Sequence, residues 1–276
     1  MKIDTTIVDA YLNSEDMSPF STSWLYCFDT EQLPDLLFSE PESWERERQI
    51  VSFIKGELIA HAMNFVPCNR RVWDALFPQW QEFLTETTLD LIVGYPEPYD
   101  AVVKQDPRGK YHVIFDLLQW GKYAEHISVA ELSQNLLTHE LFHVMTEQYF
   151  PELTRVQSKG SYMERLEAIA FNEGFAHLVS YQQRELETVP WTGEQLTEIY
   201  TSSCAKMKAA LAEKQPQRQL QYIYEADHGA YYCKYAAMCA MIYLGRQWQV
   251  GGIFRLKELF CAGYWGFGGK CVRDVC

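Results

Sequence analysis

The sequence predicts an α+β protein that is mostly helical, with a small sheet in its N-terminal part and a helical lobe after it. Long stretches of the second half carry apolar residues at helical spacing, and three short β-type runs come before them. The 276 residues, of which 47% are hydrophobic, suit one large domain or one domain with two lobes around a cleft. We therefore expect a single domain over residues 1–276, with N-terminal helices and a small sheet in 1–127 and the helical lobe in 128–276.

The first half contains the expected sheet. Residues 1–43 suggest a short helix or two with loops, and apolar residues at helical spacing predict a long amphipathic helix over about 44–65. A helix over 71–86 should be broken or kinked at Pro78, because proline lacks the amide hydrogen that a helix needs. Three strands are expected at 89–93, 101–103 and 111–117, with a turn at 106–109 between the last two.

The second half is predicted to be helical. Ser128 and Ser161 are each followed by a glutamate three residues later, which is the capping-box pattern of a helix start. The helices that these two residues begin should run to about 148 and 184. Further helices are expected over about 191–213, 229–247 with Asp227 as its cap, and 253–261. The glycine-rich tail from Gly263 should be irregular.

Composition excludes several classes of partner. A net charge of −13 argues against binding nucleic acid or an anionic membrane surface. No apolar run approaches the roughly 18 residues of a membrane span, and the first residues lack the apolar core of a signal peptide, so a cytoplasmic protein is expected. The scattered cysteines should be reduced and buried, although Cys271 and Cys276 are close enough for a disulfide or a metal site.

One segment predicts a metal site. His139-Glu140-Leu141-Phe142-His143 has the pattern H-E-x-x-H. In a helix, His139 and His143 lie about one turn apart on the same face, which lets two imidazoles bind one zinc ion. Glu140 points roughly 100° further around the helix, so it can act on a water at the metal as a general base. The surrounding helix is apolar, and buried polar groups need partners of the kind that a metal supplies.

A hydrolytic zinc ion usually has a third protein ligand and keeps one position for water. Glu173 is the best candidate, because it lies in the middle of an apolar helical segment. Glu167 is its competitor, and helix geometry alone leaves the choice between them open.

These motifs resemble those of the gluzincin metallopeptidases, which include the thermolysins and the membrane-alanyl aminopeptidases. The resemblance rests on the H-E-x-x-H segment, on the downstream string Asn172-Glu173-Gly174-Phe175-Ala176, and on Tyr232-Cys233-Lys234-Tyr235-Ala236, which is similar to the family's Y-E-K-G motif. It implies a thermolysin-like catalytic domain with the zinc cleft between two lobes. It also implies that His139, His143 and Glu173 bind one zinc ion, that Glu140 is the base, and that Tyr232 stabilises the oxyanion.

The sequence departs from the family in three places. Twenty-nine residues separate His143 from Glu173, more than in either named group. The aminopeptidase motif that grips a free amine is absent, so aminopeptidase specificity is not implied. Tyr235 replaces the glycine of Y-E-K-G, which leaves Tyr231 and His228 as alternatives to Tyr232. His177, one turn after Glu173, would orient a zinc ligand from the second shell.

The expected function is hydrolysis of peptide bonds in a peptide or protein substrate, by a zinc-activated water with Glu140 as the base. One alternative is a zinc-containing binding protein that no longer cleaves anything. Another is a zinc hydrolase that acts on non-peptide amides or esters.

Overall fold

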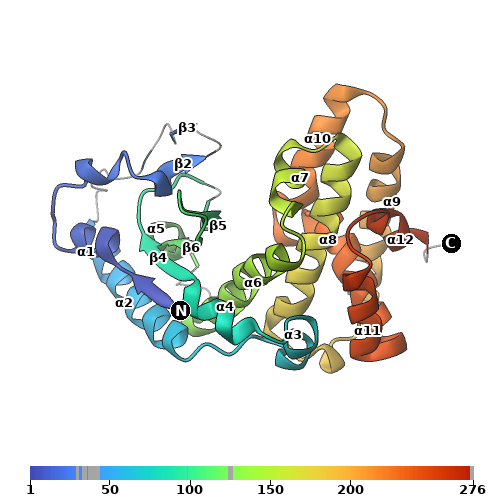
Figure 1. The fold of residues 1–276 in the computed structure, drawn as a ribbon, viewed down its shortest axis with the longest axis horizontal. Coiled ribbons are helices and arrows are strands. Elements are labelled where there is room, and N and C mark those ends of the chain that lie inside the picture. The colour runs from blue at the N-terminus through green and yellow to red at the C-terminus, as the bar shows by residue number, and fades with distance from the viewer. Residues whose placement is uncertain (29–30, 33–35, 37–43, 98, 124–126, 274–276) are drawn as a thin grey trace. The chain divides into compact units, whose positions relative to one another are not determined.

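The structure, a computed structural model, describes residues 1–28, 31–32, 36, 44–97, 99–123 and 127–273. It is mostly helical with a small sheet, which confirms the expected α+β class (Figure 1). The chain packs into two compact units. The sheet unit consists of Met1–Pro67 and Gln79–Leu141, and the helical unit consists of Cys68–Pro78 and Phe142–Cys276.

The sheet unit is built on four strands in the order β1-β4-β6-β5. β1 (Lys2–Asp4), β4 (Thr88–Ile92) and β6 (Tyr111–Asp116) are parallel, and β5 (Ala101–Gln105) pairs antiparallel with β6. β4 and most of β6 are buried, as parallel strands covered by helices should be. The turn expected at 106–109 joins β5 to β6. The Asp106 carboxylate accepts backbone N–H bonds within this turn, and Gly109 has a φ of +79° that suits glycine.

Helices cover this sheet. α1 (Thr6–Leu12) packs on β4, and α2 (Trp44–Met63) packs on α5 (Leu117–Gly121). α2 buries one stripe of apolar residues, as its spacing predicts. α4 (Trp80–Glu86) also belongs to this unit. The remaining short elements are η1 (Ser18–Phe20), η2 (Trp24–Tyr26), β2 (Cys27–Phe28) and β3 (Glu31–Gln32).

The helical unit is organised around two long helices, α8 (Tyr162–Ser180) and α11 (Tyr235–Cys261), which pack extensively on each other. α6 (Val129–Tyr149) is one continuous helix that contributes its first part to the sheet unit and its last part to the helical unit. The other elements are α3 (Arg70–Leu76), α7 (Leu153–Lys159), η3 (Tyr181–Gln183), η4 (Leu186–Thr188), α9 (Glu194–Ala212), α10 (Pro216–Asp227), η5 (Tyr231–Cys233) and α12 (Phe267–Cys271).

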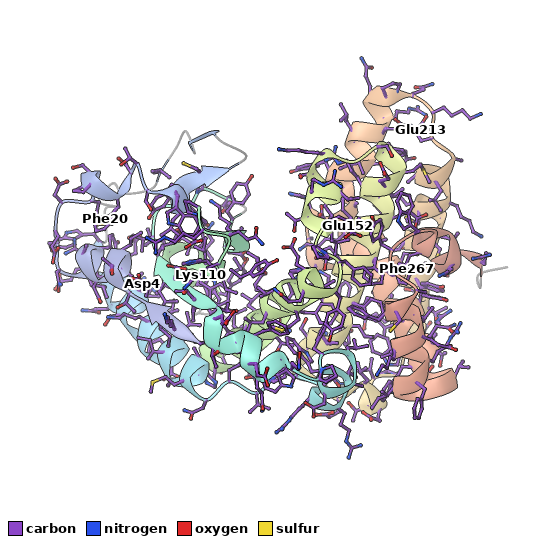
Figure 2. All side chains as sticks on the ribbon, in the orientation of Figure 1. Asp4, Phe20, Lys110, Glu152, Glu213 and Phe267 are labelled. Carbon is purple, nitrogen blue, oxygen red and sulfur yellow. The ribbon has the colours of Figure 1, made fainter. Side chains whose placement is uncertain are left out.

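Aromatic side chains fill the core of the helical unit. Phe142, Phe171, Phe175, Phe260 and Phe267 are at most 2% exposed and contact one another edge to face or stacked. Figure 2 shows Phe267 among the crowded side chains of these helices. Such ring pairs add to the free energy of burial by about 0.5–1.5 kcal/mol each. The core therefore fixes the relative positions of α8, α11 and the last part of α6.

Most of the expected helices and strands are present, and two expectations are wrong, those for Asp227 and for the tail. Asp227 does not cap a helix at 229, because it is the last residue of α10. The helices expected over 229–247 and 253–261 are both present within α11, which has a kink between them at Gly252 (φ +57°), although the first of them begins at Tyr235 rather than at 229. The tail is not irregular, since α12 forms where Phe267 is buried in the core. Cys276 lies outside the described residues.

Among the described residues, none of the helices is long and apolar enough to cross a membrane.

Candidate metal centre

α6 carries the H-E-x-x-H segment as the sequence predicts. His139 and Glu140 are buried, and the side chain of His143 is 13% exposed. Thr138 and Thr146, which flank the segment, donate their hydroxyl hydrogens to the carbonyls four residues earlier at 2.7 and 2.8 Å. The helix can therefore be buried without leaving these hydroxyls unsatisfied.

α8 carries Glu173 and His177. The expected capping box forms at its start: the Ser161 hydroxyl accepts from the backbone N–H of Glu164, and the Glu164 carboxylate accepts from the backbone N–H of Ser161 at 2.7 Å. Beyond its first turn the helix is buried almost all round, so its position is fixed by packing rather than by propensity. Glu173 and His177 are four residues apart and lie on one face.

The Glu173 carboxylate is the point where histidines from the two helices meet. Its Oε1 lies 3.4 Å from Nε2 of His143, and its Oε2 lies 3.7 Å from Nε2 of His177. One ligand atom each from His139, Glu173 and His177 lie within 4.8 Å of one another. His139 is one turn before His143 on the same continuous helix.

A further contact orients His143. Its Nδ1 lies 2.9 Å from Oδ1 of Asn172, and Nδ2 of Asn172 donates to Oε1 of Gln157 at 3.2 Å. Because the Asn172 amide nitrogen donates to Gln157, its oxygen is the acceptor for His143, and Nδ1 carries the proton. Nε2 of His143 then presents a lone pair, which is the form that binds a metal.

Glu167, the alternative to Glu173, has a different environment. Its Oε2 accepts a hydrogen bond from the backbone N–H of Gly268 at the start of α12. Burial raises the pKa of this carboxyl group, and the backbone N–H groups of residues 267–269 oppose the shift. Glu167 therefore joins α8 to α12, while Glu173 contacts the histidines.

The residues expected to stabilise an oxyanion lie on and before η5. The Tyr231 ring packs edge to face on the His177 ring, with 5.2 Å between centroids. The Tyr232 hydroxyl is 3.2 Å from the Tyr181 hydroxyl and accepts from Gln182 at 3.2 Å.

His228 forms a pair with its neighbour Asp227, in which Nδ1 lies 2.6 Å from Oδ1. The hydrogen bond from His228 to Asp227 raises the pKa of this histidine, and the negative charge of Glu173 also contributes.

Two contacts were not expected from the sequence. Asn172 forms a hydrogen bond with His143, and His177 presents a nitrogen to the same cluster as His139 and Glu173. The spacing of Glu173 and His177, i and i+4 like the two histidines of α6, is a signal that could have indicated this. The role of Asn172 has no comparable signal, because its partner is 29 positions away.

The donor set is appropriate for zinc. Imidazole nitrogens and a carboxylate oxygen are the usual ligands of hydrolytic zinc sites, and the three groups converge from two helices that packing holds in place. Zinc-binding histidines commonly donate their other ring nitrogen to a group that fixes their tautomer, and the Asn172 amide oxygen takes this place for His143.

Comparison with known proteins agrees at the level of the family. A search of curated proteins found no match, and a search of solved structures found none either. One family model matches residues 69–218, more than half of the chain and all of the segment from α6 to α9. The chain therefore belongs to the family whose description reads "Putative zinc dependent peptidase (DUF5700)".

Proposed function

We propose that this chain is a zinc metallopeptidase of the gluzincin type. It would form one metallopeptidase domain and hydrolyse peptide bonds in a peptide or protein substrate. The observation that carries the proposal is the convergence on Glu173: Nε2 of His143 lies 3.4 Å from its Oε1, and a ligand atom of His139 lies within 4.8 Å of one of its carboxylate oxygens. Two histidines and a downstream glutamate are the ligand set of this type of peptidase, and membership of a zinc-dependent peptidase family supports the same conclusion.

His139, His143 and Glu173 would hold one zinc ion. Asn172 would keep His143 in the tautomer whose Nε2 faces Glu173, and Gln157 would hold the Asn172 amide in turn. This arrangement means that the ligands are oriented before the metal binds, which increases affinity.

A bound zinc ion would act as a Lewis acid, which lowers the pKa of a water molecule and polarises the scissile carbonyl. Glu140 would take the proton from the attacking water, because it neighbours His139 but points to a different side of α6. The same carboxyl group would then pass that proton to the leaving amine.

The oxyanion formed by this attack needs a donor. His228 is one candidate, because Asp227 stabilises its protonated form and a cationic donor gives a stronger hydrogen bond than a neutral one, and Tyr231, whose ring packs on that of His177, is another. Tyr232, which the family motif suggests, has its hydroxyl within hydrogen-bonding distance of two other side chains. A donor of this kind contributes roughly 3 kcal/mol to the stability of the transition state.

A second candidate function is a zinc protein without catalytic activity, and the position of His177 favours it. If His177 joined His139, His143 and Glu173 as a fourth ligand, the site would be closed in the manner of structural zinc sites. No position would then remain for water, and the protein would bind a partner rather than cleave it.

The two functions differ in what His177 and Glu140 do. For a peptidase, Glu140→Gln should retain one zinc ion per chain and lower the rate of peptide hydrolysis at least 100-fold, because the base is lost but the ligands remain. His177→Ala should retain zinc and measurable hydrolysis. The measurements are metal content by mass spectrometry and cleavage of a peptide library, with chelator-treated wild type as the control and an ester and amide panel beside it.

Other results would contradict the peptidase. Full activity of Glu140→Gln would exclude the proposed base. An inactive wild type together with loss of zinc from His177→Ala would favour the closed site. Cleavage of the esters or amides without any cleavage of peptides would indicate a different zinc hydrolase.

A further inference from the structure

Three buried cysteines gather in the helical unit where α9, α11 and α12 meet. The Sγ atoms of Cys204 and Cys239 are 3.3 Å apart, and the Cys204 thiol lies 3.8 Å from the carbonyl oxygen of Cys271. All three residues are at most 1% exposed. The gap between the first two sulfurs exceeds the length of a disulfide bond by only about 1.3 Å, which small rotations of the two side chains can close.

We propose that Cys204 and Cys239 form a disulfide bond, which joins α9 to α11, when the protein is held under oxidising conditions. With glutathione disulfide as the oxidant, both S–H bonds break and one S–S bond forms. The two electrons and two protons that are released reduce one glutathione disulfide to two molecules of glutathione.

The surroundings favour this pair over the alternative that includes Cys271. The side chain of Cys239 also hydrogen-bonds with that of Cys271, but it is the sulfur of Cys204 that approaches the sulfur of Cys239 to 3.3 Å. α9 and α11 are long helices that pack on each other, so their approach is part of the core. The hydrogen bond with Cys239, together with burial, raises the pKa of the Cys204 thiol, so the reduced pair is uncharged and compatible with the apolar interior.

The cross-link would act on the helix that supports the metal centre. Cys239 precedes Ala240, and Ala240 is in such close contact with α8 that a Cβ built at Gly174 would lie 2.4 Å from its methyl group. The bond would also close a loop of 35 positions, which contains α10 and His228. Closing a loop of this size lowers the entropy of the unfolded chain and so stabilises the folded one.

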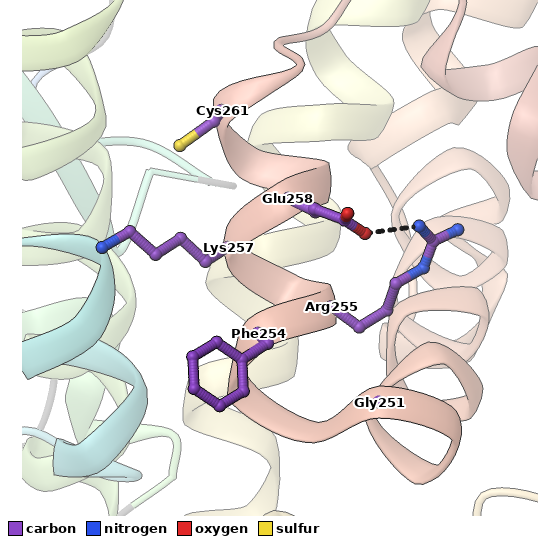
Figure 3. A pocket seen from close by; sticks show the side chains of 6 residues that line it. All are labelled: Gly251, Phe254, Arg255, Lys257, Glu258 and Cys261. Carbon is purple, nitrogen blue, oxygen red and sulfur yellow. Dashed lines mark hydrogen bonds and ion pairs between the residues drawn. The ribbon is translucent and has the colours of Figure 1, made fainter.

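Peptide mapping of the wild-type protein can determine which cysteines are linked. Trypsin places the three cysteines in separate peptides, 185–206, 235–246 and 271–273, each with a single cysteine. Protein refolded in a glutathione buffer of high oxidised fraction, alkylated and digested without reductant, should yield the linked pair of 185–206 with 235–246. Cys261, which is exposed near the end of α11, should be recovered alkylated (Figure 3).

Thermal unfolding provides a second readout. Oxidised wild type should melt on the order of 5–10 °C above the reduced protein. Cys204→Ala should abolish that difference, whereas the matched control Cys261→Ala should retain it. Cys271→Ala should retain both the difference and the linked peptide.

Three results would overturn the proposal. They are the absence of the linked pair from oxidised wild type, its replacement by a link between 235–246 and 271–273, and an equal rise in melting temperature for Cys204→Ala. None of these measurements depends on zinc or on peptidase activity, so the disulfide can fail while the proposed function stands.

Discussion

Gly174 is the residue at which the packing of the metal centre can be tested most directly. It follows Glu173 on α8 and faces α11. A Cβ at this position would lie 2.4 Å from Cβ of Ala240 and 3.3 Å from its carbonyl carbon. Backbone atoms of α11 therefore stand against this position, and no flexible side chain can move aside. We expect Gly174→Ala to force α8 and α11 apart.

The distances at Gly174 give the expected change in the free energy of unfolding. Two methyl carbons approach to about 3.5–4.0 Å, so the helices would have to separate by more than about 1 Å. Overpacking of this kind costs about 1–3 kcal/mol, and the better helix propensity of alanine returns about 1 kcal/mol. The free energy of unfolding should therefore fall by up to about 2 kcal/mol. The affinity for zinc should fall with it, because Glu173 moves with α8.

Urea denaturation and a zinc-competition titration measure these two effects. Gly56→Ala is the matched control, since Gly56 is exposed in the middle of α2 and a Cβ there has no neighbour within 4 Å. It should stabilise its own unit by up to about 1 kcal/mol. The double variant Gly174→Ala with Ala240→Gly should recover most of the lost stability. If Gly174→Ala stabilises the protein as Gly56→Ala does, the close approach of the two helices is wrong.

Two further predictions concern the polar contacts of the site. Asn172→Ala should weaken zinc binding 10- to 100-fold in the same competition titration, because His143 loses the acceptor that fixes its tautomer. Asp227→Asn should lower the pKa of His228 towards its ordinary value of 6.5, as followed by NMR titration of the imidazole protons. Because folding raises the pKa of His228, the stability that the His228–Asp227 pair contributes is present below pH 6.5 and is lost as the pH rises through the raised pKa. Asp227→Asn should therefore destabilise the protein at pH 6 but not at pH 9.

The predictions for Asn172→Ala and Asp227→Asn each have a control or a contrary outcome. Gln157→Ala leaves the bond between Asn172 and His143 in place, so it should cost less zinc affinity than Asn172→Ala. Unchanged zinc affinity in Asn172→Ala would mean that His143 is not held through Nδ1. An equal loss of stability in Asp227→Asn at both pH values would show that the pair does not act through the charge of His228.

The sequence alone determined the local parts of this protein. Helical periodicity predicted α2 and α6, and the Ser161–Glu164 pattern marked the start of α8, because caps and amphipathic stripes are properties of neighbouring residues. The spacing of His139 and His143 likewise follows from the pitch of one helix. The local pattern failed at Asp227. An aspartate there suits the start of the following helix, yet it is the last residue of α10.

Only the tertiary structure decided which distant side chains meet. Glu173 and Glu167 lie on the same helix, and the local pattern favours Glu173 without excluding Glu167. The packing of α8 brings the first to the histidines and the second to α12. The bond between Asn172 and His143 and the contact of Cys204 with Cys239 arise in the same way. Such pairs depend on how helices pack around the aromatic core, and packing is set by the shapes of many side chains together rather than by any short stretch of sequence.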